Sequence, residues 1–238
     1  MVHAAELSYS QPGEMPMMRF LLRPALFALL ACAGSTASAY CGTPLNMNHW
    51  GMPVDYRDPS QTYKRDIVER FHFTPEIENL IKGQNGPLPG DIHYTLIQLV
   101  NHHRALQAMA NWQLKHPRKP GDEFYPADCY FERALAFTPD DPLIYMIWGN
   151  YAFRNKEYDR AVLIYQRAEE LAPTDPEVQY NLGLLNLELK NYDKAKAYAQ
   201  KAYAQRYPLP GLRNKLKKLG ISLDDTVAAT KAPTTTPQ

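Results

Sequence analysis

The sequence predicts an all-α fold in which about three pairs of helices stack in chain order. The main observation is a repeat, because the segment that begins at Pro142 resembles the one that begins at Pro176, a period of 34 residues (176 minus 142). Such a period is typical of stacked helix pairs. The second observation is that small residues recur where antiparallel helices would cross closely: Gly149 with Gly183, Ala161 with Ala195, and Ala168 with Ala202.

The composition is that of a globular protein with one packed body, since 45% of the 238 residues are hydrophobic and 21% are charged. Lys and Arg number 26 and Asp and Glu number 25, so the formal net charge is +1. So small a charge provides no basic surface for nucleic acid or for an anionic membrane. We therefore expect neither as a partner.

Residues 1–39 are typical of a secretory signal. Basic residues such as Arg19 precede a short apolar stretch, and the segment Ala37–Ala39 offers a small-x-small cleavage site. The apolar stretch is too short to span a bilayer. Met17 or Met18 gives a better signal start than residue 1. We expect a periplasmic or secreted protein.

An alternative interpretation of the same segment is a lipoprotein signal. In that case Cys32 would follow the sequence Leu-Leu-Ala and would carry the lipid. Leu30 is larger than the residue usual in such a cleavage box, and an ordinary cleavage site follows. We therefore favour cleavage and keep a lipid anchor through Cys32 as the alternative.

Residues 40–100, which we call the leader, do not show the repeat. The sequence predicts a helix around Arg65–Phe71, a short helix capped at Thr74 that ends at Gly83, and a further helix that starts at Asp91. An irregular stretch precedes these helices. We expect the leader to act as a cap that covers the exposed face of the first repeat.

Removal of the signal would leave two cysteines, Cys41 and Cys129. An even pair in an oxidising compartment suggests one disulfide. A cross-link of this span is worth roughly 4–5 kcal/mol in the chain-entropy model, and it would tie the leader to the first repeat. The alternative is two unpaired thiols, and no CxxC motif indicates redox catalysis.

Three copies of the repeat follow the leader. In Asp141–Pro142 and Asp175–Pro176 an N-cap residue precedes a proline at the first helical position, where the missing N–H costs nothing. The first copy is less regular, because the turn His116–Pro126 contains an insertion rich in proline. The copies are expected at residues 103–141, 142–175 and 176–209.

These positions resemble the signature of the tetratricopeptide repeat (TPR) over about residues 103–209. The resemblance implies an α-solenoid of about three helix pairs, in which residues 210–220 form a C-terminal capping helix. The leader is similar to that of uncharacterised exported bacterial TPR proteins. Residues 221–238 have too little apolar surface to fold and are expected to be a disordered tail.

The resemblance also implies a binding surface, because the first helix of each pair lines the concave side in that family. A mixture of amide, aromatic and aliphatic groups there suits an extended peptide of a protein partner. The peptide-binding positions implied are Asn111, Met146, Asn150, Phe153, Arg154, Tyr180, Asn181, Leu184 and Lys215.

Some TPR domains grip a C-terminal carboxylate with two asparagines and several basic residues. Asn150 and Asn181 match the asparagine positions, and Lys215 matches one basic position. Met146 and Gly211 stand where lysines are expected, so the pattern departs from a full clamp. A less specific peptide groove is the expectation.

The sequence indicates neither catalytic residues nor a cofactor, since it contains no Gly-rich phosphate loop, nucleophile elbow or HExxH motif. We expect an exported scaffold that binds a partner polypeptide, for example in cell-envelope assembly or secretion. Self-association through the ends of the solenoid is a further possibility. The alternative is an enzyme or metal-handling protein that uses the leader and the start of the first repeat, which contain His72, His93, His102 and His103.

Overall fold

The structure is a computed structural model that describes residues 41, 53–84, 86–119 and 124–223. All of them belong to one compact unit, Thr36–Gln238. The predicted signal at residues 1–39, with Cys32, lies outside the described residues, and so does the predicted tail from residue 224 onward.

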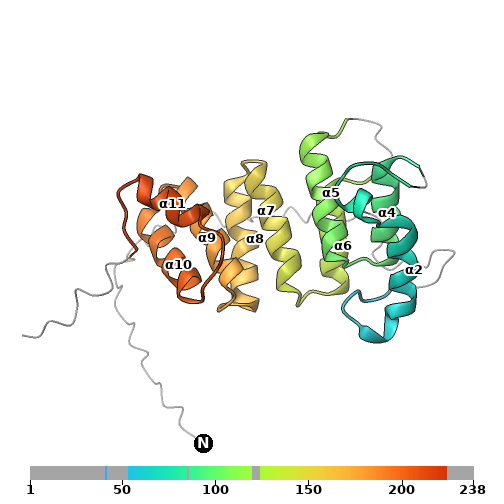
Figure 1. Ribbon diagram of the computed structural model, residues 1–238, viewed down its shortest axis with the longest axis horizontal. Coiled ribbons are helices and arrows are strands. Elements are labelled where there is room, and N and C mark those ends of the chain that lie inside the picture. The colour runs from blue at the N-terminus through green and yellow to red at the C-terminus, as the bar shows by residue number, and fades with distance from the viewer. Residues whose placement is uncertain (1–40, 42–52, 85, 120–123, 224–238) are drawn as a thin grey trace, which may run out of the picture. The chain divides into compact units, whose positions relative to one another are not determined.

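The described residues form helices and no strand, which confirms the predicted fold class. Three antiparallel pairs, α5 with α6, α7 with α8 and α9 with α10, follow one another in chain order (Figure 1). Helix α5 contacts α7, and α7 contacts α9, so the first helices of the pairs are neighbours. The elements are η1 (Pro59–Gln61), α2 (Thr62–His72), α3 (Pro75–Glu78), α4 (Leu88–Gln98), α5 (His103–Lys115), α6 (Ala127–Phe137), α7 (Pro142–Arg154), α8 (Tyr158–Leu171), α9 (Pro176–Glu188), α10 (Tyr192–Ala204) and α11 (Gly211–Lys218).

The two regular repeats start and turn alike. Asp141 and Asp175 are N-caps, as predicted: Asp141 accepts a hydrogen bond from the Leu143 N–H, and Asp175 accepts from the N–H groups of Glu177 and Val178. The turns within these pairs pass through Lys156 and Lys190, both with positive φ, at 65° and 61°. The first pair differs, because a much longer connection, residues 116–126, separates α5 from α6.

Close approach of the helices requires glycine at two equivalent places. A Cβ added at Gly149 would lie 2.7 Å from the ring of Tyr165, which is fully buried. At Gly183 an added Cβ would lie 2.4 Å from a methyl group of Leu212. The small residues that the repeat predicted therefore lie where neighbouring helices touch.

The leader departs from the sequence prediction in two places. Helix α3 ends at Glu78 and not at Gly83, because Leu80 adopts a positive φ of 57° that breaks the helix. Helix α4 begins at Leu88, before Asp91. Asp91 is not an N-cap; it is buried, and its carboxylate accepts a hydrogen bond from the Gln84 N–H at 2.7 Å.

Polar contacts attach the segment before η1 to the first repeat. Asn101 Nδ2 donates to Asp55 Oδ1 at 2.6 Å, and Asn101 Oδ1 accepts from the Tyr56 N–H at 2.8 Å. The Tyr56 ring lies 4.1 Å from that of His102. Burial opposes ionisation of Asp55, but hydrogen bonds from Arg57 and Asn101 outweigh it and lower its pKa to about 2. The segment is thus held by ionised and buried groups.

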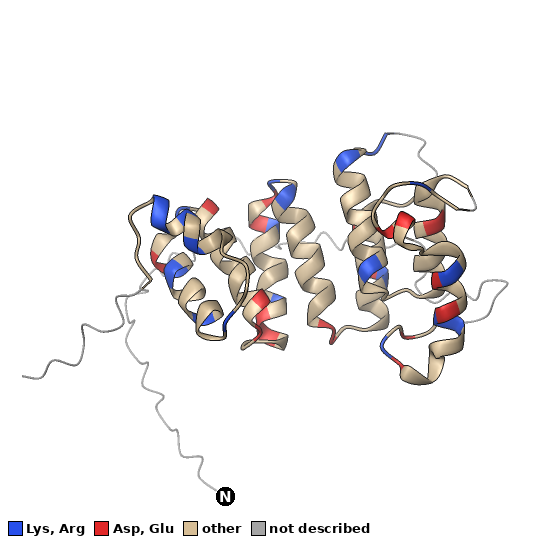
Figure 2. Cartoon of the chain, viewed as in Figure 1, with Lys and Arg blue, Asp and Glu red and all other residues tan. Residues whose placement is uncertain are grey.

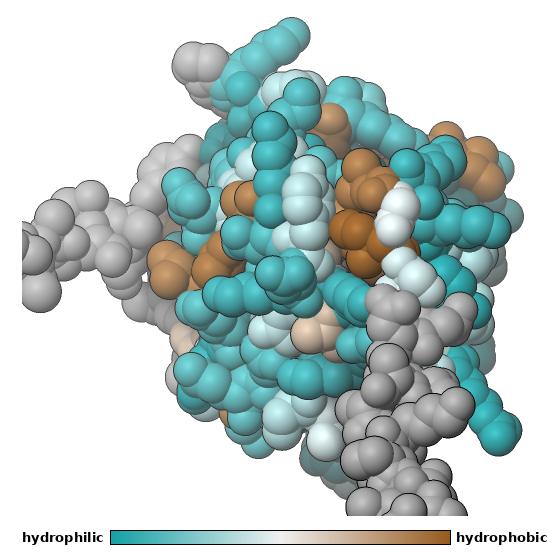
Figure 3. Space-filling view, turned by 90° about the vertical axis from the view of Figure 1, so that its left-hand side faces the viewer, coloured by the Kyte–Doolittle hydropathy of each residue, from teal (hydrophilic) through white to brown (hydrophobic). Residues whose placement is uncertain are grey.

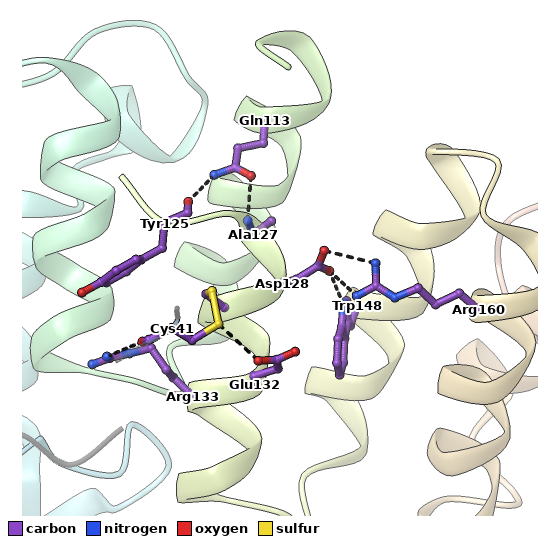
Figure 4. Close-up of a disulfide and its surroundings, with 10 residues drawn as sticks. Cys41, Gln113, Tyr125, Ala127, Asp128, Glu132, Arg133, Trp148 and Arg160 are labelled. Carbon is purple, nitrogen blue, oxygen red and sulfur yellow. Dashed lines mark hydrogen bonds and ion pairs between the residues drawn. A yellow bond between two sulfur atoms is a disulfide. The ribbon is translucent and has the colours of Figure 1, made fainter. Parts of the chain in front are cut away.

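Cys41 lies against α6 at Cys129 (Figure 4). Their Sγ atoms are 2.06 Å apart and their Cα atoms 5.0 Å apart, which is the geometry of a disulfide. Arg133 Nη1 donates to the Cys41 carbonyl oxygen at 3.3 Å, and Glu132 Oε2 lies 3.2 Å from the Cys41 Sγ. Formation of the bond in the cell stays a prediction.

Helix α11 covers the last pair. Its Leu212 and Leu216 are fully buried, whereas its lysines and arginine, blue in Figure 2, are exposed. Figure 3 looks at this end and shows hydrophobic areas bordered by hydrophilic side chains; Leu209 and Leu219 are about half exposed. None of the helices in the described ranges has both the length and the apolar character needed to cross a bilayer.

Candidate functional site

A hollow of about 400 Å³ opens along the first helices of the repeats, and we call it the groove. Its lining comes from the end of α3, from α5 and α7, and from the first turn of α9. It combines apolar, amide and charged groups. The apolar lining residues are Ala108, Leu143, Met146 and Ile147, and the polar ones are Glu78, His103, Arg104, Gln107, Asn111, Asn150 and Glu177.

Helical spacing gathers these side chains on one face of each helix. On α7 the lining residues Leu143, Met146, Ile147 and Asn150 are separated by three, four and seven positions, so they share a face. The lining residues of α5 from Arg104 onward show the same spacing. Because α5 contacts α7 and α7 contacts α9, the faces join into one surface.

Three of the predicted positions, Asn111, Met146 and Asn150, line the groove. Both asparagine oxygens have partners: Arg154 Nη1 donates to Asn111 Oδ1, and the Tyr165 hydroxyl donates to Asn150 Oδ1 at 2.5 Å. These bonds fix the orientation of the two amides. Among the described residues, their Nδ2 groups then remain available to donate to a ligand. The predicted Arg154 therefore acts on the groove through Asn111.

The other predicted positions in α7 and α9 do not line the groove. Phe153 packs in the core between the second and third pairs. Tyr180 is only 7% exposed and Leu184 packs beside it in the C-terminal core. Asn181 Nδ2 donates to the Glu177 carbonyl oxygen at 3.0 Å, so its amide is engaged by its own helix. As ligand-binding positions they stay predictions.

Lys215, the basic residue that matches a carboxylate clamp, already has an anionic partner. Its Nζ lies 3.0 Å from Glu188 Oε1, which joins α11 to α9. Gly211, where the clamp pattern expects a lysine, faces the Tyr180 hydroxyl, since an added Cβ would lie 2.7 Å from that oxygen. The C-terminal end of the stack is therefore arranged for packing of α11.

Three charged positions of the groove, Glu78, Arg104 and Glu177, were not identified from the sequence. Arg104 Nε lies 3.0 Å from Glu78 Oε1, so this pair crosses from α5 to α3. Glu177 lies across the groove in the first turn of α9. Partial burial, and then the neighbouring Asp175, raise the pKa of Glu177. The repeat relates Glu177 to the groove, because Glu177 follows the lining residue Leu143 by 34 residues (177 minus 143).

The histidines behind the alternative hypothesis contact side chains of the fold. His102 is fully buried, and its Nδ1 accepts from the Ala105 N–H at 3.1 Å as the N-cap of α5. Among the described residues, no three His, Cys, Asp or Glu side chains form a group that could hold a metal ion. The contacts join His72 to Asp91, His93 to Tyr130, His102 to Glu69 and His103 to Asp141.

Helix pairs that stack in chain order, with a groove along their first helices, define a helical-repeat scaffold. A family model described as Tetratricopeptide repeat matches residues 129–176 and 148–209, so the chain is a tetratricopeptide-repeat protein over that segment. Such repeats are a scaffold for protein–protein interaction and are typically not catalytic. The match begins after the insertion that separates α5 from α6. A search among curated proteins gave no match.

Proposed function

We propose that this protein is an exported scaffold that holds an extended segment of a partner polypeptide in the groove. The observation that carries the proposal is the amide-bearing face shared by α5 and α7, with Gln107, Asn111 and Asn150 beside apolar side chains. The Nδ2 groups of the two asparagines can donate to C=O groups of an extended backbone, and apolar positions select side chains.

The groove is largely preformed. Asn111 and Asn150 are fixed by Arg154 and by the buried Tyr165, respectively, so their amide orientation does not have to be chosen on binding. Fixed donors reduce the entropy that association costs, because only the ligand segment must be ordered. This favours recognition of a flexible peptide segment.

Export is supported by the sequence of residues 1–39 and by the Cys41–Cys129 geometry, since disulfides persist in oxidising compartments. Cell-envelope assembly or secretion is the setting we propose, with a lipid anchor through Cys32 as the alternative to a free protein. The alternative of an enzyme or metal site in the leader has no specific observation in its favour among the described residues.

The proposal is tested by photo-crosslinking in the native cell. A photoreactive residue replaces Gln107 in the groove, and the control replaces Leu163, which is 69% exposed on α8 and does not line the groove. A discrete polypeptide adduct at position 107 alone is expected. No adduct at 107, with the fold intact by circular dichroism, would contradict binding in the groove.

The same preparation tests export. Mass spectrometry of the purified protein should find a mature N-terminus at Tyr40, or a lipid on Cys32 for the anchored alternative. A cytoplasmic protein that retains residues 18–39 would contradict the proposed location. It would not contradict peptide binding in the groove, which the crosslink tests separately.

A further inference from the structure

The charges of the groove are unequally compensated. On the α5 side Arg104 pairs with Glu78 at 3.0 Å, and His103 Nε2 lies 2.8 Å from Asp141 Oδ2. On the α9 side the Glu177 carboxylate has no cationic partner within ion-pair distance among the described residues. The groove therefore presents one uncompensated negative charge.

The surroundings of Glu177 favour a cation. Asp175 caps α9, and its Oδ1 accepts from the Glu177 backbone N–H at 2.8 Å, which holds a second carboxylate beside the first. Acidic residues are concentrated along the chain where α8 passes into α9 (Figure 2). Two neighbouring carboxylates repel each other, and a cation placed against Glu177 would relieve that repulsion.

The cations of the groove are not free for an acidic ligand. Arg104, the arginine among the lining residues, is engaged by Glu78, and Arg154 lies outside the lining and donates one N–H group to Asn111. Beyond the groove, Lys215 pairs with Glu188. An anionic group placed on Arg104 would compete with Glu78, whereas a cationic side chain reaches Glu177 without breaking an ion pair.

We propose that the groove selects an extended peptide that carries a Lys or Arg side chain opposite Glu177 and an aliphatic side chain over Leu143, Met146 and Ile147. The proposal rests on the function proposed above and names the chemistry of its ligand. Charge complementarity places the basic side chain, and the apolar lining of α7 places its neighbour.

The test uses a random peptide library displayed on phage and selected against the purified protein. Peptides enriched on the wild type should share a Lys or Arg. The affinity of a selected peptide, measured by fluorescence anisotropy, should fall about fivefold in Glu177→Gln, the size expected for loss of a partly exposed charge pair. Glu177→Lys should reverse the preference toward acidic peptides.

Two controls separate the possible failures. Glu170→Gln makes the same charge change on α8, away from the groove, and should leave the affinity unchanged. Gln107→Trp fills the groove and should abolish binding. This inference alone would be overturned by peptides that lose binding in Gln107→Trp but show no preference for Lys or Arg. Peptides that bind Glu177→Gln as tightly as the wild type would also overturn it. Binding that survives Gln107→Trp, or no enrichment at all, would overturn the proposed function with it.

Discussion

Replacing Cys41 and Cys129 together by Ser is expected to lower the free energy of unfolding by about 4–5 kcal/mol. The two residues are separated by 88 positions. In the chain-entropy model a cross-link of that span lowers the entropy of the unfolded chain by about 15 cal/mol/K, which is about 4.6 kcal/mol at 25 °C. The loss is large relative to the usual stability of a domain.

Urea unfolding followed by tryptophan fluorescence measures this loss. Trp148 reports on the region, because its Nε1 donates to Asp128 Oδ1 at 2.7 Å, one residue from Cys129 (Figure 4). With an m value of about 2 kcal/mol/M, the unfolding midpoint should fall by roughly 2 M. Reductant should cause the same fall in the native protein and no change in the double variant.

The reasoning would be refuted by a native protein whose two cysteines resist alkylation before reduction and whose midpoint then moves by less than a quarter of the expected shift. Attachment of the leader at Cys41 would in that case add nothing to the stability of the repeats. An equal response of the double variant would show that the reductant acts elsewhere in the chain.

Two further predictions concern packing and pH. Gly149→Ala should lower the melting temperature, because the added Cβ would lie 2.7 Å from the Tyr165 ring and overpacking costs about 1–3 kcal/mol. The control Gly90→Ala, whose added Cβ would lie 3.7 Å from its nearest atom, should not lower it. Equal melting temperatures of the two variants would contradict this. Burial lowers the pKa of His102 below 6.5, and the hydrogen bond that His102 donates lowers the pKa of Glu69 below 4.5. Above these unfolded-state pKa values both groups stabilise the fold. That stabilisation is lost as pH falls through their lower folded-state pKa values. His102→Asn caps without titrating and should weaken the fall of the urea midpoint as pH drops below 6.5; an equally steep curve would exclude His102 as the cause.

The repeated part of the fold could be predicted because its signals are local and occur twice. Asp141 and Asp175 cap their helices by bonds to the next few backbone N–H groups, which the sequence alone specifies. In the leader the decisive contacts are distant. A helix was expected to start at Asp91, but Asp91 lies inside α4, buried and 3.0 Å from His72 Nδ1 on another helix.

The repeat also predicted some of the residues that line the groove, but not all of them. Asn111, Met146 and Asn150 follow the repeat pattern, but Tyr180, which matches Met146 one repeat later, is buried beneath residues that follow the last pair. Its ring lies 4.7 Å from that of Tyr207. Sequence periodicity describes neighbours inside the stack and does not describe how its final unit ends. The sequence could not show that Glu177 lacks a cationic partner, because that depends on which residues pair with the other charges of the groove.

The two ends of the stack are anchored unequally. The N-terminal end has the Cys41 attachment and the polar contacts of Asp55 and Asn101, whereas the C-terminal end has two buried leucines of α11 and the exposed Lys215–Glu188 pair. In a linear array of repeats, opening begins where the terminal unit is held least. Fraying is therefore expected from α11 inward, so the wall of the groove at α9 can adjust to an arriving chain while the wall at α5 acts as its fixed template.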